Sequence, residues 1–549
     1  MRYITILALS VAGLVSASNL TSEPGAAETD TAYIGRVDTI GGTTYDWQLN
    51  GPALRMVCNS PDHGVHAVWM YSASTQTTFP DRRMRYNFYD YGAGEWNWID
   101  SDYMQSGVNV ETERSGYGSL DADSAGLAIV SCHSGTPIHP SVARDMAPGA
   151  GIFEYCSGSP VMDDYLWPVI AVGQNQTIHC ACLDNASRDL LFYSRVPEWC
   201  RWDTAIRIAP PQPDPMFPSH NIAASKVSPN VVITWVDAES APSPGFYRES
   251  NDGGTTWGPP TQLPWPPAFG GDTAPSFYLG MFPYCDLHDR LHIVAKVIPF
   301  VGGQGFFMPV ELWHWCRENV PQWSRIHRAG WRTLCPLPEP CASRPSIGED
   351  RYGGLYVCWE QLDSLNCEPL TNQLRADIFY SRDNYDNGMT WQSWVRITDL
   401  DSSSKRYPSI MGCFGSDTLH VVYEVDKVAG FFVQNQGPAT DNPIVVHKVY
   451  VPVGIGSEPL AEVVGFELAA RPNPFSGHTR LSYVLPSSGR VRLAVYDMTG
   501  RQVALLVDRF QAPGRYSVNW HTVDLSPGVY VAKLKTSSGS TVKKLVVQH

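Results

Sequence analysis

Short apolar stretches of similar pattern recur along the whole chain. Six of them align, namely GVHAVWMY, TIHCACLD, NVVITWVD, RLHIVAKV, GLYVCWEQ and TLHVVYEV, and a seventh, GLAIVSCH, fits more loosely. Their central positions lie about 59 residues apart on average and are His66, Ala128, His179, Val232, His292, Tyr356 and His420. A period of this length indicates an internal structural repeat.

Further elements recur in phase with these stretches. A short strand precedes each one and is often opened by a proline: Pro168, Pro275, Pro345 or Pro408. An aromatic strand, a turn and a tryptophan follow, so each unit reads as four short strands. One such sheet cannot bury both faces alone, whereas several arranged radially can. The pattern predicts a β-propeller of about seven blades over residues 35–452, with YIGRVDTIGG completing the last blade; six blades is the alternative, because the Ala128 unit is poorly patterned.

Composition supports an all-β chain with a large core. Of 549 residues, 43% are hydrophobic and 17% are charged, which excludes general disorder. The 46 glycines and 43 prolines suit many short strands joined by turns. No long stretch has the periodicity of an amphipathic helix.

The chain begins with features of an export signal. Arg2 is followed by an apolar run from Ile4 to Val15 and by the small residues of a cleavage site, which predicts a signal peptide over residues 1–18. The apolar run is too short to span a bilayer comfortably, and no other segment is long enough, so we expect no transmembrane segment in the mature chain.

Charge is distributed unevenly. The net charge is −14, but the segment from Gly465 onward carries 11 basic and 4 acidic residues. The body upstream of it is therefore strongly acidic, which argues against nucleic acid or an anionic membrane as its partner.

The stretch SNDGGTTW places polar residues between the third and fourth strands of one unit. It resembles the Asp box, or bacterial neuraminidase repeat, through Ser250, Asp252, Gly254, Thr256 and Trp257. A second copy, NYDNGMTW, keeps Asp386, Gly388, Thr390 and Trp391 and has Asn384 in place of the serine. We expect a structural turn in which the aspartate accepts backbone hydrogen bonds, the glycine has a positive φ, Thr256 begins the next strand and the tryptophan packs between sheets.

The resemblance to sialidase propellers also implies a site to look for. That family holds a substrate carboxylate with three arginines and uses a tyrosine nucleophile activated by a glutamate. The Arg-Ile-Pro signature of the family is absent here, and the candidates are Arg344, Arg406, Tyr407, Glu360 and Glu424. Convergence of these residues at one mouth of the channel would favour a glycoside hydrolase of the exo-sialidase type. Because no complete catalytic set can be assembled, the leading interpretation is a non-catalytic binding or scaffold propeller for glycans or surface proteins.

Histidine and cysteine do not predict a metal site or a cofactor. His66, His179, His292 and His420 recur at one strand position but on different blades, so we expect hydrogen bonds between sheets instead of a shared ion. Two interpretations of the 13 cysteines are open: they are buried small hydrophobic residues, or some of them form disulfides. The candidate disulfide pairs are Cys335–Cys341 and Cys358–Cys367.

The pattern changes after a linker at residues 453–464. Residues 465–549 alternate as six strands with turns between them, which predicts a small immunoglobulin-like β-sandwich. This segment resembles the C-terminal sorting domain of type IX secretion, with matches that include Asn473, Pro474, Gly528, Tyr530, Lys543 and Lys544. The resemblance implies the type IX secretion machinery as a partner and a secreted or outer-membrane-surface location after signal-peptide export.

Overall fold

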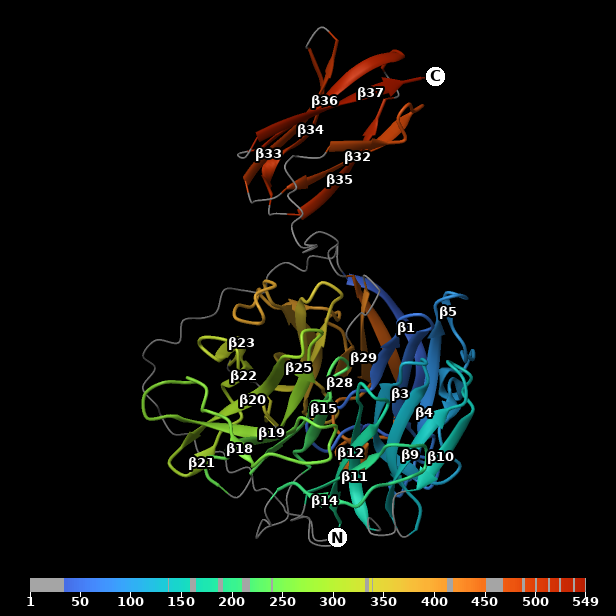
Figure 1. The fold of residues 1–549 in the computed structure, drawn as a ribbon, viewed down its shortest axis with the longest axis vertical. Helices are drawn as coiled ribbons and strands as arrows, with labels where there is room; N and C mark the ends of the chain where they lie inside the picture. Colours follow the sequence, from blue (N-terminus) through green and yellow to red (C-terminus); the bar gives the residue numbers. More distant parts are fainter. Residues whose placement is uncertain are drawn as a thin grey trace.

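The computed structural model describes residues 34–136, 138–157, 164–185, 191–209, 218–237, 240–330, 335–337, 339–411, 418–450, 468–485, 489–498, 501–511, 514–522, 525–536 and 539–548. Within residues 34–450 the chain forms seven antiparallel sheets, each of four strands in sequential hydrogen-bonded order, two of them with a short additional strand (Figure 1). The predicted signal peptide, residues 1–18, and the predicted linker, residues 453–464, lie outside the described residues.

The strands follow the repeat. The first strands are β2 (Val57–Ser60), β7 (Ser115–Ala122), β11 (Tyr165–Val172), β15 (Asn221–Ala224), β19 (Ala274–Cys285), β24 (Ala342–Glu349) and β28 (Ser404–Met411). The second strands are β3 (Gly64–Tyr71), β8 (Ala128–Ser134), β12 (Ile178–Asp184), β16 (Val231–Val236), β20 (Leu291–Val301), β25 (Leu355–Cys367) and β29 (Thr418–Asp426). Each of the seven recurring apolar stretches thus supplies the second strand of a separate sheet.

Most of the outermost, fourth strands are shorter than the others. The third strands are β4 (Arg83–Asp90), β9 (His139–Asp145), β13 (Leu191–Val196), β17 (Gly245–Ser250), β22 (Val310–Cys316), β26 (Leu374–Arg382) and β30 (Asn442–Tyr450). The fourth are β5 (Glu95–Trp96), β10 (Phe153–Ser157), β14 (Ile206–Arg207), β18 (Thr261–Gln262), β23 (Trp323–Ala329), β27 (Val395–Arg396) and β1 (Ile34–Thr43). The remaining elements of this part are β6 (Val108–Asn109), β21 (Gln304–Gly305) and the 3₁₀ turns η1 (Tyr103–Gln105) and η3 (Phe432–Gln434).

The sheets form a closed, propeller-like ring. Each first strand contacts the first strand of the next sheet, from β2 through β7, β11, β15, β19 and β24 to β28, and β28 in turn contacts β2. The seventh sheet has the order β1-β30-β29-β28, so the N-terminal strand completes it as expected. Radial arrangement leaves only the fourth strand of each sheet as an outer edge, and most of these strands are short.

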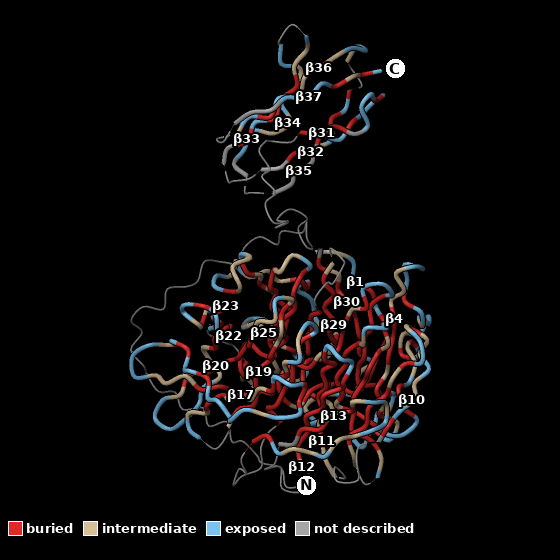
Figure 2. The backbone as a smooth tube through the Cα atoms, viewed as in Figure 1, coloured by how far each residue is buried: buried red, intermediate tan, exposed pale blue. Residues whose placement is uncertain are grey.

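Packing between sheets explains the near-continuous apolar character of the second strands. All eight residues of β3 are buried, because neighbouring sheets cover both of its faces. Buried residues fill the interior of the ring, and exposed ones lie on its outer strands and turns (Figure 2).

Five of the seven first strands contain a bulge. Each register shift includes a residue with left-handed backbone, at φ between 52° and 58°: Tyr117, Trp167, Leu279, Arg344 and Tyr407. Such bulges redirect side chains and bend the strand. Two of the five are catalytic candidates from the sequence, which places these candidates at irregular points of the ring.

The C-terminal part has two sheets around one hydrophobic core. The first has the order β31-β32-β35 and the second β34-β33-β36-β37. The strands are β31 (Leu468–Arg471), β32 (His478–Leu485), β33 (Gly489–Asp497), β34 (Gln502–Gln511), β35 (Gly514–His521), β36 (Gly528–Thr536) and β37 (Gly539–Val547). In the residues that the structure describes, no helix has the length and apolar character needed to cross a membrane.

Candidate functional site

Four of the five catalytic candidates converge near the N-terminal ends of β24 and β28. The guanidinium of Arg344 is paired with Glu360, and it also lies 3.2 Å from Glu339. Arg406 is paired with Glu339 and lies 3.3 Å from Glu360. The backbone N–H of Tyr407 donates to the other oxygen of Glu360 at 2.7 Å. Two cations and two carboxylates therefore neutralise one another in the interior of the ring.

Both arginine side chains are only 6% exposed, so the network is closed to solvent. Burial alone would raise the pKa of Glu339, but the charges of Arg406 and Arg344 lower it to about 2. Glu339 was not among the predicted residues, because it lies in the irregular segment before β24 and no repeat position marks it. Its carboxylate occupies the donors that a substrate carboxylate would need.

Tyr407 and the fifth candidate, Glu424, are not arranged as a nucleophile and its base. Burial raises the pKa of Tyr407 well above its usual value although Arg344 and Arg406 act to lower it, and its hydroxyl lies 3.3 Å from the carbonyl oxygen of Asp46. Glu424 accepts a hydrogen bond from Asn442 at 2.9 Å, and burial raises its pKa well above the usual range. A protonated, buried tyrosine is a poor nucleophile.

The opposite end of the ring contains a cavity of about 320 Å³. Its walls include residues from the first strands of all seven sheets, so it lies on the central axis. Many of them are the last residues of their strands, such as Val172, Ala224, Cys285 and Met411. This volume lies in the range of small-ligand sites. Sequence reasoning did not identify it, because its residues come from seven separate repeat units.

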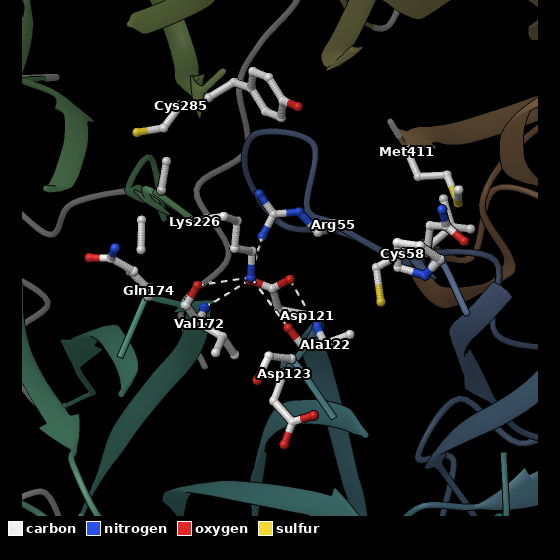
Figure 3. A pocket seen from close by; sticks show the side chains of 18 of the residues that line it. Arg55, Cys58, Asp121, Ala122, Asp123, Val172, Gln174, Lys226, Cys285 and Met411 are labelled. Carbon is white, nitrogen blue, oxygen red and sulfur yellow. Dashed lines mark hydrogen bonds and ion pairs between the residues drawn. The ribbon is translucent and has the colours of Figure 1, made fainter. Parts of the chain in front are cut away.

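The cavity wall contains two cations beside one buried carboxylate (Figure 3). Asp121 lies 3.0 Å from the ammonium of Lys226 and 3.4 Å from the guanidinium of Arg55. Burial would raise the pKa of Asp121, but Lys226 and Arg55 hold it below its usual value. The Lys226 side chain is 41% exposed. The second acid of the wall, Asp123, accepts hydrogen bonds from backbone N–H groups of its own turn. The wall thus carries two cations and two carboxylates, and the Lys226 ammonium donates to Asp121 and to the carbonyls of Ala122 and Val172.

In the turn at residues 250–257 the polar side chains bond to the turn itself. Asp252 accepts from the Thr256 N–H at 2.8 Å and from its hydroxyl at 2.6 Å, and these bonds lower the pKa of Asp252 to about 2. Gly254 has φ +78°. The ring of Trp257 packs at 4.7 Å against Tyr193 of the preceding sheet. Thr256 does not begin a strand, however; the short fourth strand starts at Thr261.

The turn at residues 384–391 reaches the same geometry by a different route. Thr390 donates its N–H to Asp386 at 3.1 Å, Gly388 has φ +70°, and Trp391 packs against His314 of the preceding sheet. In the first turn the N–H of the glycine donates to Ser250, whereas here it donates to Asp383 at 2.9 Å. The residue before the motif thus replaces the missing serine.

Three of the four recurring histidines bond within their own sheets, which corrects the expectation of bonds between sheets. The fourth, His420, has no hydrogen-bond partner at Nδ1 among the described residues. His66 contacts the Tyr86 hydroxyl at 2.7 Å, and His179 contacts that of Tyr193 at 2.7 Å. His292 contacts His314 at 2.9 Å. Each partner lies two residues before the position directly opposite in the next strand, on the same face, where diagonal neighbours can reach one another.

Both candidate disulfide pairs are wrong. The bonds join Cys156 to Cys200 and Cys335 to Cys367, while Cys341 and Cys358 are free and buried. Cys358 and Cys367 belong to one strand, β25, where they pair with Tyr380 and Leu374. These partners are six residues apart along β26, or about 20 Å, far beyond the reach of a disulfide.

Some residues of the predicted sorting signal form hydrogen bonds within the C-terminal part, and others are exposed. The Asn473 side chain bridges to the last strand, donating to the Lys544 carbonyl and accepting from the Val546 N–H, both at 2.8 Å. Pro474 follows it. Tyr530 is buried and donates its hydroxyl to the Ser526 carbonyl at 2.8 Å. Gly528, Lys543 and Lys544 are exposed.

Comparisons with known proteins identify the C-terminal part. Residues 470–548 match the secretion system C-terminal sorting domain. No curated protein matches the chain. Similar solved structures include a polysaccharide lyase described as an ulvan lyase (TM-score 0.45, 11% identity, 74% of this chain and 96% of that chain), an α-L-arabinanase of Penicillium chrysogenum (0.38, 13%, 61% and 93%) and the endosialidase of phage phi92 (0.41, 9%, 94% and 88%). At these scores the similarity assigns no function. The tail is a type IX sorting domain, and the protein is exported to the cell surface or beyond it.

Proposed function

We propose that this protein is a type IX cargo whose body is a seven-bladed, Asp-box propeller of the sialidase-like type, and whose tail is an immunoglobulin-like sandwich. The body acts as a non-catalytic binding module, and its ligand is a glycan with an acidic group held in the central cavity. The observation that carries this proposal is the partly exposed Lys226 side chain in the wall of an axial cavity of about 320 Å³. An accessible cation in a partly apolar pocket suits an anionic sugar.

A glycoside hydrolase of the exo-sialidase type is the second candidate. The convergence of Arg344, Arg406, Glu360 and Tyr407 favours it, because the sequence predicted these residues as a set. The buried ion pairs that these residues already form argue against a hydrolase. Glu339 and Glu360 already occupy both guanidinium groups, and a competing substrate carboxylate would have to displace buried ion pairs.

The experiment is a retention and hydrolysis assay with the purified full-length protein. The panel contains glycans bearing carboxylate or sulfate groups and their neutral counterparts, and sugar release is measured in the same samples. We expect retention of the anionic glycans only, no release of sugar, and binding at least about tenfold weaker in Lys226→Gln, because the charge at the cavity is lost. Lys427→Gln is the matched control, since the Lys427 side chain is 43% exposed but lies outside the cavity.

Equal retention of neutral and anionic glycans, or equal losses in the two lysine variants, would contradict the cavity as the binding site. Release of sugar by the unaltered protein would establish the hydrolase instead.

A further inference from the structure

A histidine and two carboxylates meet between two neighbouring sheets, away from the arginine network. Asp286 and His288 belong to the turn that joins β19 to β20, and Glu349 is the last residue of β24 in the next sheet. One potential ligand atom from each of the three side chains lies within 4.8 Å of the other two. The three residues bring together the oxygen and nitrogen donors that divalent cations use in proteins.

Glu349 supplies an independent sign that a ligand belongs here. Its side chain is 1% exposed, and one carboxylate oxygen accepts from the Tyr284 hydroxyl at 3.2 Å and from the Leu287 N–H at 3.0 Å. The other oxygen, Oε1, has no hydrogen-bond partner among the described residues. A buried charged oxygen without a partner is costly, and a bound ion is one way to satisfy it.

This unpartnered oxygen lies near the imidazole of His288, beside Gly353. Glu349 Oε1 and His288 Cε1 lie 3.8 and 3.7 Å from the point that a Cβ on Gly353 would occupy, so both border the same space. The His288 side chain is 65% exposed. An ion can therefore approach from solvent on the side of His288, while the two carboxylates hold it from the interior.

The balance of charge leaves room for a cation. Arg290 contacts Asp286 Oδ2 at 2.6 Å, and two backbone N–H groups donate to Oδ1. One guanidinium and the imidazole of His292, whose Nε2 lies 3.3 Å from Asp286 Oδ2, thus face two carboxylates.

We propose that Asp286, His288 and Glu349 form a site for a divalent transition-metal ion, with Zn²⁺ as the best-fitting cation. Three protein ligands leave at least one position for water. The ion would link the β19–β20 turn to the end of β24 and so stabilise the contact between two neighbouring sheets. This site is separate from the proposed glycan function and does not depend on it.

The test is a titration of the purified, untagged full-length protein with Zn²⁺ in competition with a chromogenic chelator. We expect one tight site per chain, weakened at least about thirtyfold in His288→Ala and in Glu349→Gln, because each variant removes one of three ligands. The glutamine is close to isosteric and can still accept from Tyr284 and Leu287. His63→Ala removes another exposed histidine and should leave the affinity unchanged.

A further variant tests Asp286 without removing it. Because Arg290 competes with the ion for Asp286 Oδ2, Arg290→Gln should tighten Zn²⁺ binding severalfold. Absence of a tight site in the unaltered protein, unchanged affinity in His288→Ala and Glu349→Gln, or unchanged or weaker binding in Arg290→Gln would overturn the three-residue site.

Discussion

Gly254 lies so close to Tyr193 of the preceding sheet that a Cβ at this position would come within 1.8 Å of the phenol oxygen. The same relationship recurs at Gly388, whose Cβ would lie 2.4 Å from the ring of His314. In both turns a glycine is required for two reasons: its backbone is left-handed, and a side chain of the neighbouring sheet fills the space that a Cβ would need. The turns thus act as contacts between sheets as well as connections within them.

Gly254→Ala should destabilise the protein more than a change of backbone preference alone would. Gly270 is the matched control, because its φ of +75° is similar and no atom lies within 4 Å of the point that a Cβ there would occupy. We expect about 1–2 kcal/mol of strain in each alanine variant and about 1–3 kcal/mol more in Gly254→Ala from the displaced Tyr193. Urea unfolding measures both, and equal losses would show that the close approach carries no cost.

Buried neutral histidines should make the body sensitive to acid. Burial lowers the pKa of His66 to about 3, and those of His133, His179 and His420 behave alike. The unfolded chain binds protons below about pH 6.5 where the native state does not, so stability rises with pH between about 3 and 6.5. For each such histidine, the free energy of unfolding should fall by about 2 kcal/mol when the pH is lowered from 6.5 to 5.

The measurement for this prediction is the free energy of unfolding at pH 7.5 and pH 5, before and after His66→Gln. The variant loses the hydrogen bonds to Ser60 and Tyr86 at both pH values, but its loss relative to the unaltered protein should be about 2 kcal/mol smaller at pH 5. A loss of the same size at both pH values would contradict the assignment of His66 as a buried neutral group.

Arg344 and Glu360 should be strongly coupled in stability. Removal of either partner leaves a buried charge with less compensation, so Arg344→Met and Glu360→Gln should each cost about 3–5 kcal/mol. The double variant should cost clearly less than the sum of the two. A double-mutant cycle by urea unfolding checks this, and additive losses would indicate that the two charges do not interact.

The disulfide pairing can be checked directly. Digestion without reduction, followed by mass spectrometry, should yield peptides linked through Cys156–Cys200 and Cys335–Cys367. Cys341 and Cys358 should react with an alkylating reagent only after unfolding, because both are completely buried. Detection of a peptide linked through Cys335–Cys341 would contradict the structure.

The sequence predicts the sheets well because the repeat acts through local pattern. The stretch GVHAVWMY becomes β3, and its six counterparts become second strands, since a strand covered on both faces has to be apolar throughout. The expected role of the N-terminal segment also holds, as β1 pairs with β30. The glycine of each turn was predictable because its backbone requirement is local.

The site could be predicted only in part, because its members are brought together by the ring and not by sequence spacing. Arg344 and Arg406 stand out beside strand starts, but Glu339, which neutralises both, lies in a segment without a pattern. Asp121 lies in β7 and Lys226 follows β15, 105 residues later in the sequence. Only closure of the ring places them 3.0 Å from each other.

The pairing of β1 with β30 places Ile34 opposite Val449, so the first and last strands of the ring end side by side. Paired residues in neighbouring antiparallel strands lie only about 5 Å apart. A short peptide could therefore join these two points, and the ring could be opened at an exposed turn instead. The body is thus a good scaffold for circular permutation. A set of variants, each with its new termini at a different turn, would show which sheet has to form before the ring can close.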